Sequence, residues 1–174
     1  MARTEILSGK KLLIVDDEPD ILETLQDLLD TCLIDTAPNY KTAVKFLEKE
    51  HYDAAIFDIM GVQGYDLLKL AAQKNLPVLM LTAHALNPEA LVQSLKTGAQ
   101  AYIPKEKMSD IDIYLAEMFQ ARSQGIARHA NWYVRLKSFF DSKFGPDWHK
   151  TDPEFWQAFD RNYVVTQKEL EQML

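Results

Sequence analysis

Five side chains able to bind a metal ion or a phosphate group each come directly after a short apolar run. They are Asp16 and Asp17 after residues 12–15, Asp58 after 54–57, Thr82 after 78–81, and Lys105 after 101–104. Continuous apolar runs of this length are typical of strands buried on both faces of a parallel sheet. Ligands bind such sheets at the carboxyl ends of the strands, so we expect the five side chains to meet there.

Three carboxylates in this set need a positive partner. If residues 12–15 and 54–57 form neighbouring strands, about 4.8 Å apart, then Asp16, Asp17 and Asp58 crowd together. Carboxylates that close cannot all stay ionised without a cation, and Mg²⁺ is the ion that takes a few carboxylates together with phosphate. Each residue taken alone has a plainer reading: an Asp after a strand is most often a helix N-cap, and Thr82 or Lys105 could be ordinary strand-end residues.

The segments between the apolar runs carry apolar residues at helical spacing. They lie within residues 21–29, 43–47, 67–71 and 111–119, and a further helix opens at Asn87–Pro88. Pro19 and the pair Asn87–Pro88 are typical of first helical turns, and Ser109 with Asp112 has the spacing of a capping box. Five strand–helix pairs predict a doubly wound α/β fold with right-handed crossovers.

The ordered set of motifs resembles the receiver domain of two-component response regulators. The resemblance covers roughly residues 9–124, and it is carried by the segments at 13–18, 57–60, 81–83 and 98–105, which read LIVDDE, FDIM, LTA and GAQAYIPK. It implies a flavodoxin-like five-stranded parallel sheet. Residues 125–174 would then be an α-helical extension.

The resemblance also implies a role for each site residue. Asp58 would accept a phosphoryl group from the phosphohistidine of a sensor histidine kinase or a phosphotransfer protein. Asp16, Asp17, Asp58 and the Met60 carbonyl would hold Mg²⁺. Thr82 and Lys105 would contact the phosphoryl oxygens, and Tyr102 would be the aromatic switch coupled to Thr82. Such a protein is a signalling phosphoacceptor, and its only catalysis is its own phosphorylation and dephosphorylation.

Three positions depart from the family pattern. The loop after Asp58 is about two residues short, and Gly61 stands where the family has proline, which puts the Met60 carbonyl in question. Glu106 follows Lys105 in place of a cis proline, so we expect a trans peptide bond or a strained cis bond held by the fold. His84, two residues after Thr82, is either a residue at the mouth of the pocket or an ordinary surface histidine.

Residues 120–174 differ in composition from the rest. They hold 8 basic and 7 acidic residues, whereas the whole chain has a net charge of −7, and they contain all three tryptophans. Apolar residues at helical spacing, the break at Gly145–Pro146, the restart at residues 152–154 and a capping box at residues 166–169 predict about three helices. Such a surface packs on its own receiver domain or mediates a homodimer or partner contact. With a charge near zero and no helix-turn-helix pattern, we do not expect DNA binding.

The 174-residue chain has the composition of a folded protein with one cysteine, Cys32, and no long apolar segment. We therefore expect a cytoplasmic bacterial response regulator that signals through protein contacts, without a membrane span. The first alternative is a receiver-fold interaction module that works without phosphate. The second is a Mg²⁺-dependent phosphatase of related fold, which would normally carry a second Asp where Met60 stands.

Overall fold

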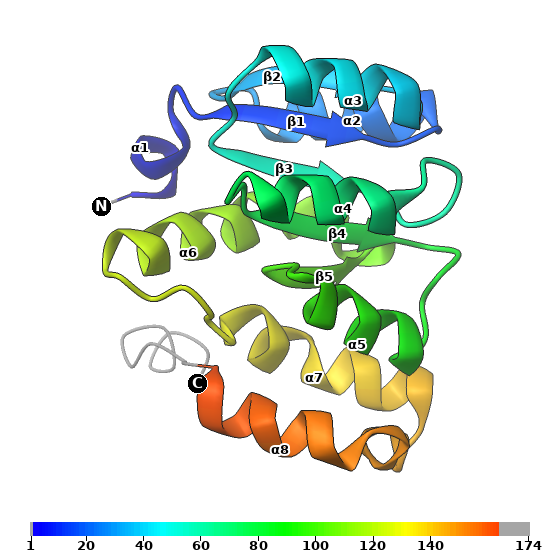
Figure 1. Ribbon diagram of the computed structural model, residues 1–174. Helices are drawn as coiled ribbons and strands as arrows, with labels where there is room; N and C mark the ends of the chain where they lie inside the picture. Colours follow the sequence, from blue (N-terminus) through cyan, green and yellow to red (C-terminus); the bar gives the residue numbers. More distant parts are fainter. Residues whose placement is uncertain (1, 164–174) are drawn as a thin grey trace.

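The computed structural model describes residues 2–163, and its core is a five-stranded parallel sheet in the order β2-β1-β3-β4-β5 (Figure 1). The elements up to the last strand are α1 (Arg3–Leu7), β1 (Lys11–Val15), α2 (Pro19–Leu28), β2 (Leu33–Ala37), α3 (Tyr40–Lys49), β3 (Ala54–Phe57), α4 (Gly64–Gln73), β4 (Val78–Thr82), α5 (Pro88–Thr97) and β5 (Ala101–Pro104). The 3₁₀ helix η1 (Lys105–Asp110), α6 (Ile111–Ser123), α7 (Asn131–Phe144), the 3₁₀ helix η2 (Trp148–Thr151) and α8 (Pro153–Asn162) follow.

The sheet is buried on both faces, as its continuous apolar strands predict. Helices α3, α4 and α5 pack side by side on one face, and α2 packs with α6 on the other. Strands β1, β3 and β4 are apolar and buried almost throughout. Strand β1 pairs with β3 in a register that places Val15 opposite Phe57. The doubly wound fold expected from the sequence is therefore confirmed.

Side-chain N-caps explain where several helices begin. The side chain of Asn39 accepts a hydrogen bond from Thr42 N, and the side chain of Asn87 accepts one from Ala90 N. Such caps satisfy backbone donors that the first helical turn leaves free. Pro19 and Pro88 occupy the first turns of α2 and α5, where their missing N–H groups cost nothing.

The structure differs from the sequence predictions at two places. The capping box at Ser109 and Asp112 does not form, because the chain leaves β5 through the 3₁₀ helix η1 and α6 begins at Ile111 without a side-chain cap. The short helix α1 was not expected at all. It is held by tertiary packing against α6, where Leu7 is buried.

Beyond α6 the chain forms the helical extension, and its start and break points follow the sequence signals. Gly125 and Gly145 have positive φ just past the ends of α6 and α7, and Asp152 caps α8 by accepting a hydrogen bond from Phe155 N. The predicted capping box at residues 166–169 lies outside the described residues. Of the two arrangements expected for the extension, the described part shows packing on its own receiver domain, with α7 against β5 and η2 against α5.

None of the helices within residues 2–163 combines the length and the apolar character that crossing a bilayer would require.

Candidate functional site

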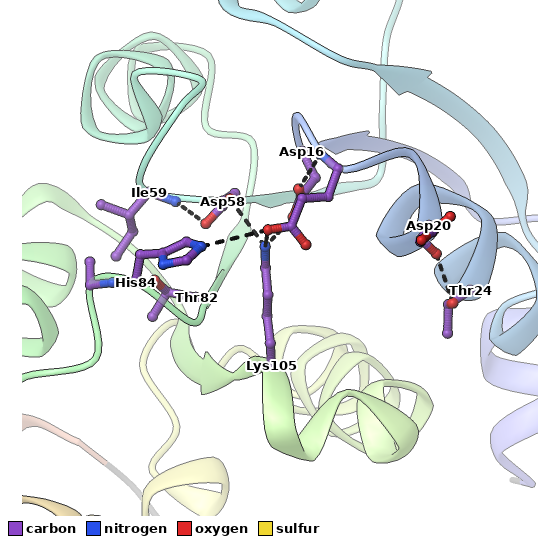
Figure 2. A network of polar contacts seen from close by, with 10 residues as sticks. Asp16, Asp20, Thr24, Asp58, Ile59, Thr82, His84 and Lys105 are labelled. Atoms are coloured by element: carbon purple, nitrogen blue, oxygen red, sulfur yellow. Dashed lines mark hydrogen bonds and ion pairs between the residues drawn. The ribbon is translucent and has the colours of Figure 1, made fainter.

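The carboxyl edge of the sheet brings together residues from four strand ends (Figure 2). Asp16 follows β1 and Asp58 follows β3, and the two strands stay paired to this point because Asp58 N donates to Val15 O. Thr82 is the last residue of β4, and Lys105 is the first residue after β5. Parallel strands end at one edge, so Asp16, Asp58 and Lys105 come together although more than forty positions separate each from the next in the sequence.

Lys105 bridges two of the carboxylates. Its Nζ lies 2.8 Å from Asp16 Oδ2 and donates to Asp58 Oδ2 at 3.2 Å. The side chains of Asp16 and Asp58 are each 2% exposed and that of Lys105 is 8% exposed, so the bridge is shielded from water. Asp16 Oδ1 also accepts from Glu18 N, and Asp58 Oδ1 accepts from Ile59 N. Both carboxylates are therefore fixed in place by the backbone as well as by the ammonium group.

Burial sets the protonation of this pocket. It raises the pKa of Asp58, repulsion from Asp16 raises it further, and Lys105 offsets part of the rise. Burial likewise raises the pKa of Asp16 against the opposing hydrogen bond from Lys105. Burial works against the charge of Lys105, but its two carboxylate partners outweigh it and raise its pKa. The pocket thus concentrates negative charge where a cation or a phosphoryl group with its counterion is favoured.

A second acidic group lies at the end of β1. Carboxylate oxygens of Asp16, Asp17 and Glu18 lie within 4.8 Å of one another, the one such group of three within the described residues. Hard oxygen donors of this kind fit Mg²⁺, which binds through one or two carboxylates and keeps water or phosphate for its other positions. Glu18 was not singled out from the sequence as a site residue, although the run of three acidic residues was its signal.

The loop that follows Asp58 folds tightly against this acidic group. Gly61 has φ +83°, and a Cβ there would overlap the carboxylate of Asp17. Gly64 has no positive φ, and glycine is required there because a Cβ would run into the backbone of Asp58 and Ile59. The shortened loop therefore depends on two glycines for two different reasons, conformation at one and space at the other.

Thr82 and Tyr102 are connected through the loop between β4 and α5. The Thr82 hydroxyl accepts a hydrogen bond from Ala85 N at 3.1 Å. The Tyr102 hydroxyl donates to Ala85 O and accepts from Asn87 N at 3.2 Å. Both side chains are fully buried. Thr82, at the end of β4, and the aromatic residue predicted as a switch thus hold the same short loop.

Three further sequence predictions concern residues around this site. The His84 side chain is 70% exposed, as a surface histidine would be, and its Nε2 lies 3.7 Å from Oε1 of Glu18. The peptide bond between Lys105 and Glu106 is trans, as expected, since the described residues contain no cis bond. The side chain of Met60 is 53% exposed, and the role of its carbonyl remains a prediction.

Together, the strand order and the pocket of acidic residues with a bridging lysine define a doubly wound α/β receiver domain. Residues 12–115 match the response regulator receiver domain family, and the chain belongs to that family. It is 37% identical over 105 residues to the response regulator protein PilR of Pseudomonas aeruginosa, a match that covers 57% of this chain and 23% of PilR. It is 38% identical over 99 residues to the heme response regulator HssR of Staphylococcus aureus, covering 53% of this chain and 43% of HssR.

Solved structures agree with this assignment. A CheY-like receiver domain protein from Methanospirillum hungatei superimposes with a TM-score of 0.62 at 27% identity, covering 68% of this chain and 99% of that one. A response regulator structure from Chloroflexus aurantiacus gives a TM-score of 0.58 at 30% identity, covering 66% and 99%. The chain matches less than half the length of PilR and HssR, and the helical extension lies beyond the family match.

Proposed function

We propose that this protein is a response regulator whose Asp58 accepts a phosphoryl group from the phosphohistidine of a sensor histidine kinase or a phosphotransfer protein. Residues 9–124 form the phosphoacceptor domain and residues 125–174 the extension. The observation that carries the proposal is the position of Asp58: buried, fixed by Ile59 N, and held by Lys105 next to the acidic group at the end of β1.

In the transfer, an oxygen of the Asp58 carboxylate attacks the phosphorus atom, the phosphorus–nitrogen bond breaks, and the histidine imidazole leaves with the electron pair. Because the transition state is loose, the site acts mainly by positioning groups and neutralising charge. Asp16, Asp17 and Asp58, with the Met60 carbonyl, would hold Mg²⁺, which when bound neutralises the phosphoryl oxygens. Lys105, already 3.2 Å from Asp58, pairs with one of these oxygens, and the Thr82 hydroxyl donates to another.

We further propose that the output is a protein contact made by the extension. The extension is rich in aromatic residues and nearly neutral, with 8 basic and 7 acidic residues over 120–174. DNA binding relies on a basic surface that neutralises phosphates, which this composition lacks.

One observation favours the alternative of a phosphate-independent interaction module. The Lys105 ammonium already pairs with both Asp16 and Asp58, and two glycines hold the loop after Asp58 close to them, so the charges of this site are partly balanced within the chain itself. The module alternative predicts stable complexes that form equally with and without Mg²⁺ and a phosphodonor.

Intact mass spectrometry separates the two functions. The wild-type chain is incubated with Mg²⁺ and acetyl phosphate, beside Asp58→Asn and the control Asp66→Asn, which alters an exposed acid in the first turn of α4. We expect a labile gain of one phosphate in the wild type and the control, and none in Asp58→Asn. Absence of phosphate from the wild type, together with Mg²⁺-independent complexes in size-exclusion chromatography, would support the module.

A further inference from the structure

The helical extension occupies the face of the receiver domain formed by β5 and its neighbours. Strand β5 is the last strand of the sheet, and α7 lies along it while η2 contacts α5 (Figure 1). Two ion pairs fasten the extension to this face, Lys96 to Asp152 at 2.8 Å and Glu106 to Lys143 at 3.3 Å. Exposed pairs of this kind contribute little to stability. They fix the orientation of the extension, and apolar burial supplies most of the binding energy.

The centre of this contact is the ring of Phe140 on the ring of Tyr102. The ring centroids are 6.0 Å apart at an interplanar angle of 41°, and both residues are completely buried. The ring of Phe140 in turn stacks on the ring of Phe144 and packs edge-to-face against Trp148. Outward rotation of Tyr102 would require displacement of Phe140 and its aromatic neighbours.

Tyr102 is equally constrained on its inner side. Its hydroxyl is bonded to Ala85 O and Asn87 N, and Ala85 N is bonded to the Thr82 hydroxyl. Three successive contacts therefore join the residue beside the phosphoacceptor to the extension: Thr82 to Ala85, Ala85 to Tyr102, and Tyr102 to Phe140. Helix α7 lies beyond the residues that match the family. This series of contacts is therefore a property of this protein.

We propose that the extension is a built-in clamp that seats Phe140 on Tyr102 and keeps this aromatic side chain buried in the unphosphorylated protein. Tyr102 becomes free only when the extension leaves β5, so the extension controls the conformation of this face. A second consequence rests on the proposed function. If phosphoryl binding at Thr82 requires the buried Tyr102, the docked extension preorganises the site, and undocking lowers its affinity for a phosphoryl group.

The first test measures how accessible Tyr102 is in the full chain. Hydroxyl-radical footprinting with peptide mass spectrometry compares wild type, Phe140→Ala and the control Val134→Ala, which truncates an exposed residue of the same helix. We expect a several-fold rise in Tyr102 oxidation in Phe140→Ala only. Oxidation of Tyr52, which bonds Asp35 of β2 at the opposite edge of the sheet, should be unchanged. Unchanged oxidation of Tyr102 in a folded Phe140→Ala would overturn the clamp. If circular dichroism shows that this variant does not fold, Phe140→Leu, which removes the ring but keeps apolar bulk, is measured in its place.

The second test titrates Mg²⁺ and beryllofluoride, a mimic of the phosphoryl group, by calorimetry. We expect affinity at least about 5-fold weaker in Phe140→Ala than in wild type and Val134→Ala, the lower end of typical coupling between two sites. Equal or tighter binding in Phe140→Ala contradicts the coupling. If no form of the protein binds the mimic, the proposed function fails, and the clamp is decided by the oxidation of Tyr102 alone.

Discussion

At the scale of single residues, the site depends on backbone positions as much as on acidic side chains. Gly61 sits beside the Asp17 carboxylate with φ +83°, and Gly125 has a similar φ of +79° with nothing within 4 Å of its Cβ position. Both glycines adopt a conformation that other residues reach only at a cost of about 1–2 kcal/mol. Only Gly61 adds a steric constraint on a proposed metal ligand, and Gly125 therefore serves as its matched control.

We expect Gly61→Ala and Gly125→Ala each to lower the free energy of unfolding by about 1 kcal/mol, because both need a positive φ. In addition, Gly61→Ala should weaken Mg²⁺ binding at least about tenfold, equivalent to ~1.4 kcal/mol, because the new methyl group displaces Asp17. Calorimetric titration with MgCl₂ measures this difference. Equal Mg²⁺ affinities in the two variants would show that Asp17 is not a ligand.

The meeting of Asp16, Asp58 and Lys105 could be predicted from the sequence, since each follows a strand and parallel strands share a carboxyl edge. Asp17 instead lies with Asp16 and Glu18, and its meeting with Asp58 stays a prediction. The sequence could not predict that Lys105 bridges Asp16 and Asp58, or that Gly64 is needed for space against the Asp58 backbone. Both depend on distances set by the loop after β3. That loop has neither helical nor strand periodicity, so no pattern described it.

At the scale of elements, the junction between α6 and α7 contains a buried histidine. His129 is 1% exposed, and within the described residues neither ring nitrogen has a hydrogen-bond partner. Burial lowers its pKa to about 4 from an ordinary value of 6.5. The folded junction therefore holds neutral imidazole, and protonation of His129 opposes folding.

The pKa shift predicts a loss of stability in acid. Between pH 6.5 and 4 the unfolded chain binds a proton at His129 that the folded chain does not, so stability falls as the pH drops. The contribution reaches about 3 kcal/mol at most. Urea unfolding at several pH values should show a shallower loss in His129→Leu than in wild type. The control His51→Leu, at an exposed site, should follow the wild type, and identical slopes in all three would contradict the assignment.

Local signals predicted where a helix begins when a side chain caps its own helix, as Asn87 and Asp152 do. They failed where tertiary packing decides. Helix α1 has only five residues, too few to be stable alone, and exists because Leu7 is buried against α6. At Ser109 the residue types of a capping box are present, but η1 occupies that position.

At the scale of the whole molecule, the receiver domain and the extension share buried contacts, with Tyr102 against Phe140 at the centre. The doubly wound sheet followed from five alternating strands and helices. The surface that the extension covers could not be predicted from the sequence. Helical spacing shows which side of a helix is apolar, but not which surface that side packs against.

Shared packing predicts cooperative unfolding of the two parts. All three tryptophans, Trp132, Trp148 and Trp156, lie in the extension, so tryptophan fluorescence follows the extension, whereas far-UV circular dichroism is dominated by the receiver domain. We expect both signals to give one coincident urea transition in wild type, as two-state unfolding requires. In Phe140→Ala the fluorescence transition should move to lower urea. Separate transitions in the wild type would contradict joint packing.

The most direct test of the account locates the phosphoryl group. Protein treated with Mg²⁺ and acetyl phosphate is reduced with borohydride, which converts a phosphorylated aspartate into homoserine, and the peptides are sequenced by mass spectrometry. We expect homoserine at position 58 alone, dependent on Mg²⁺. Homoserine at position 16 or 17, or its absence under conditions where a known receiver domain is modified, would contradict it.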